Sequence, residues 1–216
     1  KLADLSARGV RVERVDYDDP GTLAAALAGR DTLMLVSSSV PGNRLAQHGA
    51  AIDAAVAAGV TRIVYTSAPH ATTSELVLAP DHKATEELIA ASGIPATILR
   101  NNWYTEVYLG ALEQARETGV VAASAGDGRV ASASRADYAD AAAAVLAGSG
   151  HEGKVYELSG DVAWTFDDLA AAISTVIGRQ VAYRRLDRDE HLAALTAAGI
   201  DEGTAQFVVA LDQNIR

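Results

Sequence analysis

The chain has 216 residues, of which 49% are hydrophobic but only 5% aromatic, and its formal net charge at pH 7 is -10. This length suffices for one substantial core with a small appended lobe. The acidic balance, without any Lys/Arg cluster, argues against nucleic acid or an anionic membrane surface as a partner. Because the chain has no cysteine and its five histidines are scattered, we expect no disulfide, no thiol nucleophile and no metal site.

No apolar run approaches the roughly 20 residues that a membrane span needs. The first residues also lack the apolar core of a signal peptide. We therefore expect a cytoplasmic protein that does not bind membranes. The sequence leaves the oligomeric state open, with a homodimer as one candidate.

The first half of the chain alternates short apolar runs with alanine-rich helical stretches. After the tail of a helix at 1–8, we expect strands at 10–17, 31–37, 61–67 and 94–100, and helices at 22–28, 44–58 and 81–91. The run from Leu33 to Val36 is typical of a strand covered on both faces. Strand and helix alternating at these spacings predict an α/β fold with a doubly wound, parallel, Rossmann-like sheet.

The second half predicts a small α/β C-terminal lobe. We expect a helix from Trp103 to about Thr118, followed by a tight turn at 126–129. A helix then begins at a Ser134/Asp137 capping box, and a second helix with a Thr165/Asp168 cap ends at Ile177. Strands are expected at 154–159 and 180–186, and a last helix at 191–211 is broken at Gly199. These elements predict a dinucleotide-binding domain over 1–123 and a substrate-side lobe over 124–216. The helix at 134–147 is a candidate to pack back on the first domain.

Polar side chains follow two of the predicted strands. Ser37, Ser38 and Ser39 come directly after one apolar run, and Asn101–Tyr104 follows another. Ligands of open α/β sheets bind at the carboxyl ends of the strands. Two amides beside two flat aromatic rings suit a planar, polar-edged ligand, but the rings could equally pack the sheet against the next helix.

Several motifs taken together resemble a known family. They are Leu35-Val36-Ser37-Ser38-Ser39, Tyr65-Thr66-Ser67, Leu99-Arg100-Asn101-Asn102-Trp103-Tyr104, Ser134-Arg135-Ala136-Asp137-Tyr138 and His151-Glu152-Gly153-Lys154-Val155-Tyr156-Glu157-Leu158. With these motifs the chain resembles the type 2 NAD(P)H:quinone oxidoreductases of the NmrA-like, atypical short-chain dehydrogenases. The resemblance covers essentially the whole chain.

The resemblance implies NADPH or NADH as cofactor and a small-molecule quinone as substrate. The adenine edge is expected at Asp16 and Tyr17, the middle of the cofactor along Ser37–Ser39, and the nicotinamide near Ser67 and the loop Asn102–Val107. The implied cofactor residues are Asp16, Tyr17, Ser37, Ser38, Ser39, Ser67, Asn102, Trp103, Tyr104, Thr105, Glu106 and Val107. For Asp16, a role as a turn residue before the next helix is an equal alternative.

The chain departs from the family at its start. The family begins with a strand and a Gly-x-x-Gly-x-x-Gly turn at the cofactor pyrophosphate, and no such motif occurs here. In the strand order 3-2-1-4-5-6, the segment 10–17 would be the third strand and 31–37 the fourth. We therefore expect the natural protein to carry roughly 30 to 40 further N-terminal residues, about one βαβ unit, and the C-terminal end also looks clipped.

Catalysis must also differ from the usual short-chain dehydrogenase pattern. Ser67 occupies the expected serine position, but Leu78 and His82 stand where a Tyr and a Lys are usual. A quinone tolerates this loss, because hydride transfer gives a delocalised hydroquinone anion that water can protonate, so positioning can suffice. We expect Asn102 to fix a quinone oxygen while Trp103 or Tyr104 stacks on the ring.

His82 is the second catalytic candidate. On a helix it shares a face with Glu86, which would fix its tautomer and raise its pKa. The alternative is a solvated histidine at a helix start. Tyr65 and Tyr138 are expected in the core, and His70 is a candidate to line the pocket.

The preferred hypothesis is therefore an NAD(P)H-dependent quinone reductase that transfers hydride directly, without flavin. The main alternative is a non-catalytic, NmrA-like redox sensor that binds the dinucleotide and a protein partner. A third is reduction of another conjugated carbonyl. The natural quinone and the choice between NADPH and NADH cannot be read from these residues.

Overall fold

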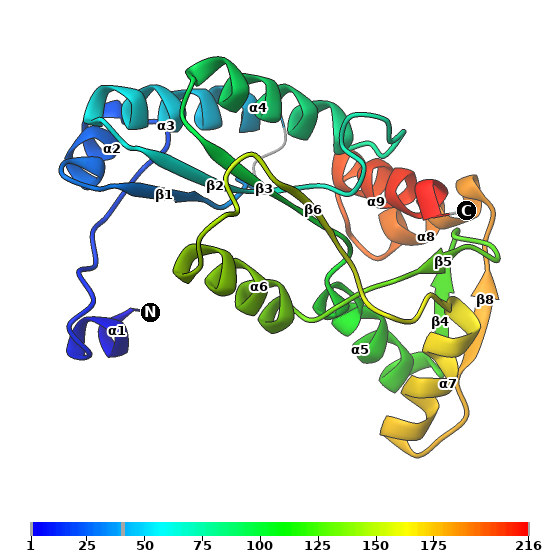
Figure 1. The fold of residues 1–216 in the computed structure, drawn as a ribbon. Helices are drawn as coiled ribbons and strands as arrows, with labels where there is room; N and C mark the ends of the chain where they lie inside the picture. The colour runs from blue at the N-terminus through cyan, green and yellow to red at the C-terminus, as the bar shows by residue number, and fades with distance from the viewer. Residues whose placement is uncertain (1, 40–41, 216) are drawn as a thin grey trace. The chain divides into compact units, whose positions relative to one another are not determined.

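The structure is a computed structural model that describes residues 2–39 and 42–215. It divides into two compact units, drawn together in Figure 1 and described here one at a time. Unit 1 comprises Lys1–Ser67, Asp81–Arg100 and Val145–Tyr156, and unit 2 comprises Ala68–Pro80, Asn101–Ala144 and Glu157–Arg216. The boundary that we predicted at residue 123 stays a prediction.

A parallel sheet organises unit 1. Strands β1 (Thr32–Leu35), β2 (Arg62–Ser67) and β3 (Ala96–Asn101) run parallel, with Leu33 opposite Ile63 and Ile63 opposite Ala96. The sheet order is β1-β2-β3-β6, where β6 is Val155–Leu158. The predicted α/β class with a parallel, Rossmann-like sheet is confirmed.

The helices of unit 1 follow the predicted signals closely. They are α1 (Ala3–Ala7), α2 (Pro20–Leu27), α3 (Arg44–Ala58) and α4 (Ala79–Ser92). Helix α2 begins at a proline because Asp19 before it accepts the Gly21 N–H. Helix α3 ends at Gly59, whose φ of 73° is the left-handed conformation that glycine adopts without strain.

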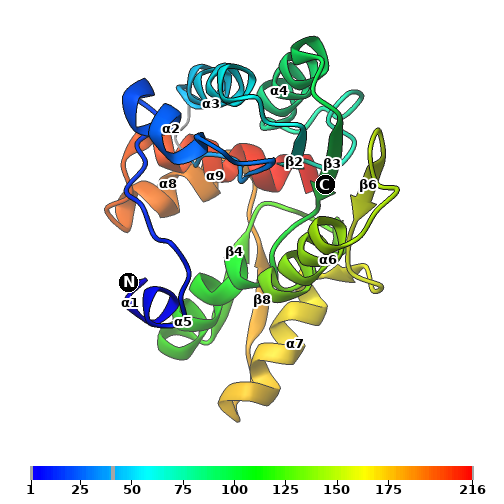
Figure 2. The same cartoon turned by 60° about the vertical axis from the view of Figure 1, so that its left-hand side comes forward.

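Helices α3 and α4 lie along the same side of β2 and β3 in both views (Figures 1 and 2). Because side chains alternate along a strand, every second strand residue faces these helices. The resulting buried cluster comprises Leu23, Leu35, Ala51, Ile52, Ile63, Tyr65, Ile89 and Ile98. Tyr65 is fully buried, as predicted.

Two strand predictions in unit 1 are wrong in whole or in part. Segment 10–17 is extended but forms no strand, because no strand among the described residues lies beside it to accept its backbone hydrogen bonds. Its valines Val10, Val12 and Val15 are exposed. Of the run at 33–36, the first three residues belong to β1, but the run is not covered on both faces, since Val36 directly after the strand is 57% exposed.

Unit 2 combines short strands with helices. Its elements are the 3-10 helix η1 (Thr105–Tyr108), α5 (Leu109–Thr118), β4 (Val120–Ala123), β5 (Arg129–Val130), α6 (Arg135–Ala147, in unit 2 up to Ala144), β7 (Trp164–Thr165), α7 (Phe166–Ile177), β8 (Ala182–Arg185), α8 (Arg188–Ala197) and α9 (Glu202–Ile215). Strand β4 pairs with β8 in parallel, and β5 pairs with β7 antiparallel. Aromatic rings bind the core together, with Tyr108 and Trp164 edge to face at 4.7 Å.

The local signals of unit 2 were largely correct. Both capping boxes form, since Asp137 accepts the Ser134 N–H and Asp168 accepts the Thr165 N–H. The C-terminal helix is broken around Gly199, as expected. The helix after Trp103 begins later than predicted, because residues 105–108 form a 3-10 turn before α5.

Candidate cofactor and substrate residues

The backbone after β1 is fixed by side chains from β2 and α3. The Ser37 N–H donates to Thr66 Oγ1 at 2.8 Å, and the Ser38 N–H donates to His48 Nε2 at 2.9 Å. The Ser38 hydroxyl donates to Gln47 Oε1 at 2.5 Å, while Arg44 Nε donates to the Ser38 carbonyl at 2.7 Å. Two of the serines predicted to bind the cofactor, Ser37 and Ser38, therefore lie in a segment whose backbone is already held in place.

His48 connects this turn to α4. It is fully buried, and burial together with the charge of Arg44 lowers its pKa to about 4. Since Nε2 accepts the Ser38 N–H, the proton of the neutral ring sits on Nδ1 and is donated to Thr85 Oγ1 at 2.9 Å. Thr85 donates in turn to the Asp81 carbonyl.

At the proposed adenine end, Asp16 acts as a turn residue. Its Oδ1 accepts the Asp18 N–H at 3.0 Å, as in an Asx turn. The Tyr17 hydroxyl donates to the Val36 carbonyl at 3.2 Å. Asp18, which the sequence did not single out, accepts from the side-chain amides of Asn43 and Gln47. Cofactor contacts by Asp16 and Tyr17 stay predictions.

Ser67 lies at the end of β2, opposite Arg100 on β3. Its hydroxyl donates to Glu86 Oε1 at 2.6 Å. Arg100 grips the same carboxylate with two bonds, Nε to Oε1 at 3.0 Å and Nη2 to Oε2 at 2.7 Å. Such a two-point pair is among the strongest that side chains form.

The predicted pairing of His82 with Glu86 is wrong. Glu86 turns to Ser67 and Arg100, whereas His82 Nδ1 bonds the Tyr65 hydroxyl at 2.8 Å. The pKa of His82 is lowered to about 4, mainly by burial, and not raised. The alternative of a solvated histidine is also wrong, because His82 is buried.

In unit 2, the loop after β3 holds Asn102 in one orientation. Its Oδ1 accepts the N–H of the next residue, Trp103, at 2.8 Å, and its own backbone N–H donates to the Leu158 carbonyl at 2.9 Å. Its Nδ2 group is therefore left as a hydrogen-bond donor. This arrangement is consistent with the predicted role of Asn102 in fixing a substrate oxygen, which stays a prediction.

Both aromatic residues of this loop make packing contacts inside unit 2. Trp103 packs against the buried cluster around Phe166. The Tyr104 ring meets Tyr138 edge to face at 5.2 Å, and Arg135 Cζ lies 5.4 Å from the Tyr104 ring centroid. The packing alternative is thus observed for both rings, while stacking on a ligand stays a prediction.

The rest of the loop has one capping role and one exposed apolar group. Glu106 accepts the Arg135 N–H with both carboxylate oxygens, at 3.0 and 3.1 Å, and so caps the start of α6. The Thr105 hydroxyl bonds the Ser132 hydroxyl at 2.9 Å. Val107 is exposed.

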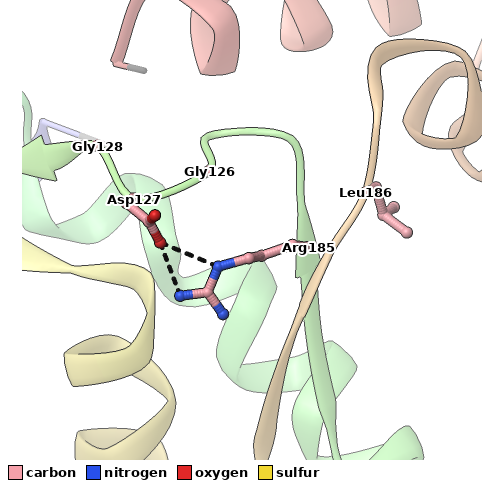
Figure 3. Close-up of a pocket in the computed structure, with 5 residues that line it drawn as sticks. All are labelled: Gly126, Asp127, Gly128, Arg185 and Leu186. Atoms are coloured by element: carbon pink, nitrogen blue, oxygen red, sulfur yellow. Dashed lines mark hydrogen bonds and ion pairs between the residues drawn. The ribbon is translucent and has the colours of Figure 1, made fainter.

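Figure 3 shows a cavity in unit 2 that the sequence did not indicate. It has a volume of about 490 Å³ and is lined by Gly126, Asp127, Gly128, Arg185 and Leu186. Arg185 closes one side, because its Nε and Nη2 both bond Asp127 Oδ1, at 3.1 and 2.9 Å. None of the predicted site residues lines this cavity.

Residues 2–39 and 42–215 contain neither a metal site nor a helix that could span a membrane. No group of His, Cys, Asp and Glu side chains there could hold a metal ion. No helix in this part of the chain is long and apolar enough to cross a membrane.

Sequence reasoning missed the polar face of α3. Arg44, Gln47 and His48 are spaced as i, i+3 and i+4, which places them on one side of the helix. They follow the serine run by only a few residues. That spacing was the available signal that they would bond the backbone after β1.

Comparison with known proteins decides the family. The model of a family described as NAD(P)H-binding matches residues 1–148. The chain belongs to the NAD(P)H-binding family. It is 49% identical over 212 residues to Quinone oxidoreductase 2 of Escherichia coli, covering 98% of this chain and 74% of that protein.

Two solved structures resemble this chain over almost its full length. The NADPH-dependent quinone oxidoreductase of Escherichia coli, complexed with NADPH, matches with a TM-score of 0.95 and 48% identity, over 99% of this chain and 76% of that one. The triphenylmethane reductase of Citrobacter sp., complexed with NADP(H), matches with a TM-score of 0.93 and 37% identity, over 99% of this chain and 76% of that one.

The chemistry of the residues at the ends of β1 and β2 fits a nicotinamide dinucleotide. Ser37, Ser39 and Ser67 supply hydroxyl groups. The backbone of Ser37 is held by β2 and that of Ser38 by α3. Val36 beside them is an exposed apolar group at a strand end. A dinucleotide offers sugar hydroxyls, amides and flat rings, which need this mixture of polar and apolar contacts.

Proposed function

We propose that this protein is an NAD(P)H-dependent quinone reductase that acts without flavin, with NADPH as the preferred cofactor. One observation carries the proposal: the chain matches Escherichia coli Quinone oxidoreductase 2 at 49% identity along almost its entire length. The alignment covers 98% of the chain and so includes both units, and the proposal does not rest on the cofactor-binding fold alone.

The unit 1 residues have the role of holding the cofactor. Ser37, Ser38 and Ser39 follow β1 in a turn that α3 has already ordered, so little conformational entropy remains to be lost when a ligand binds. Tyr17 and Asp16 stay proposed contacts at the adenine end. When bound, the reduced nicotinamide supplies a hydride to the quinone.

The unit 2 loop has the role of positioning the quinone. Asn102 presents Nδ2 as a donor, since its Oδ1 is occupied by the Trp103 N–H. A donor at a quinone oxygen stabilises the negative charge that develops there during hydride transfer. Tyr104, Thr105, Glu106 and Val107 stay proposed contacts from the same loop.

Protonation of the product needs no dedicated side-chain acid. The hydroquinone anion takes one proton from water, which balances the transfer of one hydride. Leu78 carries no proton to give, and the low pKa of His82 leaves that ring neutral at pH 7. The pairing with Glu86 that suggested a catalytic role for His82 does not form, and that role stays a prediction.

Quinone-dependent turnover tests the proposal against the sensor alternative. We expect the purified full-length protein to consume NADPH steadily when a benzoquinone or naphthoquinone is present, and not in its absence. NADPH binding without turnover across several quinones would contradict the proposal and favour the non-catalytic sensor. A cytoplasmic location and a homodimer remain predictions, which fractionation and sedimentation would test.

A further inference from the structure

Ser67, Glu86 and Arg100 form a buried hydrogen-bonded group. This group fixes the orientation of the Ser67 hydroxyl, which the resemblance did not imply. All three residues belong to unit 1, on β2, α4 and β3. The side chains of Glu86 and Arg100 are only 11% and 12% exposed. The three contacts that join them are 2.6, 3.0 and 2.7 Å long.

The chemistry of the pair decides which atom donates. Arg100 holds both oxygens of Glu86, and this pairing favours the ionised carboxylate, which has no proton to give. The hydrogen in the contact between Ser67 and Glu86 is therefore the serine's own. With its proton directed at Glu86, the Ser67 hydroxyl has only lone pairs left for a ligand.

We propose that Glu86 and Arg100 are positioning residues that hold Ser67 as a hydrogen-bond acceptor for the carboxamide N–H of the nicotinamide. This inference rests on the proposed function, which puts Ser67 beside the nicotinamide. It also assigns Ser67 no part in donating a proton or a hydrogen bond to the quinone oxygen. Such a role would need the hydroxyl hydrogen of Ser67, which is already donated to Glu86.

A cofactor analogue without that N–H gives the test. Reduced 3-acetylpyridine adenine dinucleotide phosphate has an acetyl group in place of the carboxamide, so it keeps the carbonyl and lacks the donor. We expect the wild-type protein to bind NADPH roughly 3- to 10-fold more tightly than the analogue, the value of one hydrogen bond. The measurement is the dissociation constant, by calorimetry, without quinone.

Ser67→Ala should abolish this preference by weakening NADPH binding and leaving binding of the analogue unchanged. The variant leaves no buried charge unpaired, because Arg100 still holds Glu86. Ser92→Ala is the matched control, since that hydroxyl bonds the Ile89 carbonyl on the same helix as Glu86. Equal weakening of both ligands in Ser67→Ala, or no weakening of either, would overturn the proposal.

The positioning role needs a variant that retains Ser67. In the double variant Glu86→Leu with Arg100→Met no side-chain oxygen at position 86 accepts the Ser67 hydrogen and no charge is left unpaired, so the preference for NADPH should fall toward one. A preference equal to that of the wild type would refute the role of Glu86 and Arg100. The binding measurement uses no quinone and is therefore independent of turnover. If the wild-type protein prefers NADPH over the analogue but shows no quinone-dependent turnover, the result would contradict the proposed function and not this inference.

Discussion

Asn102 shows how one residue can be oriented by its own neighbour. The Trp103 N–H occupies Oδ1, so the amide presents Nδ2 as its donor. Asn102→Asp keeps the acceptor but replaces the donor with a second negative oxygen. Since the hydroquinone anion is also negative, we expect kcat/KM for the quinone to fall by at least about 10-fold.

A matched change of charge controls this experiment. Gln206→Glu converts an exposed amide on α9 into an acid and adds the same charge. Its kcat/KM for the quinone should equal that of the wild type. Equal activity of Asn102→Asp and the wild type would show that no donor is needed at this position.

At the same scale, His82 and Glu86 show where the sequence was insufficient. Their spacing correctly places both residues on one helix, but helical spacing does not say what faces them. Arg100 on β3 offers Glu86 two charged bonds, and Tyr65 on β2 offers His82 a buried hydroxyl. Both partners come from distant parts of the chain, so only the fold could reveal them.

At the scale of elements, two neutral histidines tie the helices of unit 1 to its sheet. His48 on α3 bonds the turn after β1, and His82 on α4 bonds β2. Each has a folded pKa of about 4. A histidine with a lowered pKa binds fewer protons when folded than when unfolded, so stability is lost as the pH falls below its unfolded pKa of about 6.5.

We expect the free energy of unfolding to fall by roughly 2 kcal/mol for each such histidine between pH 7 and pH 5. The variant His82→Gln keeps an amide that can bond Tyr65 but does not titrate. It should therefore lose about 2 kcal/mol less between pH 7 and pH 5 than the wild type. Urea unfolding at the two pH values measures this loss. His70→Asn, at a side chain that is 72% exposed, is the control and should retain the wild-type loss. An equal fall in the free energy of unfolding in His82→Gln and in the wild type would contradict the account.

Elements with strong local signals were predictable, and those that depend on a partner were not. The Thr165/Asp168 box and Gly59 each satisfy backbone groups at a helix end and appear where expected, whereas α2 begins at Pro20, two residues before its predicted start. Segment 10–17 has the alternation of a strand but finds no neighbour among the described residues. A strand is defined by its pairing, and pairing cannot be read from one segment.

At the scale of the whole molecule, the parallel sheet and the family follow from the alternation of elements together with the motifs at the strand ends. The family motif at residues 99–104 begins in a unit 1 segment that ends at Arg100 and continues in the unit 2 segment that begins at Asn101. The fold of unit 2 was less predictable, because β4 and β8 pair although they lie far apart in the chain, with Val120 opposite Ala182, and carry no distinctive motif.

Direct hydride transfer without flavin is the central claim, and a deuterium isotope effect tests it most directly. Flavin-free, full-length protein would be mixed with a benzoquinone and NADPH deuterated at either of the two C4 positions, in single-turnover experiments. We predict that quinone-dependent oxidation proceeds without added flavin and slows for one of the two labelled cofactors only. Oxidation that requires added flavin, or that proceeds at the same rate with both labels as with unlabelled NADPH, would contradict the claim.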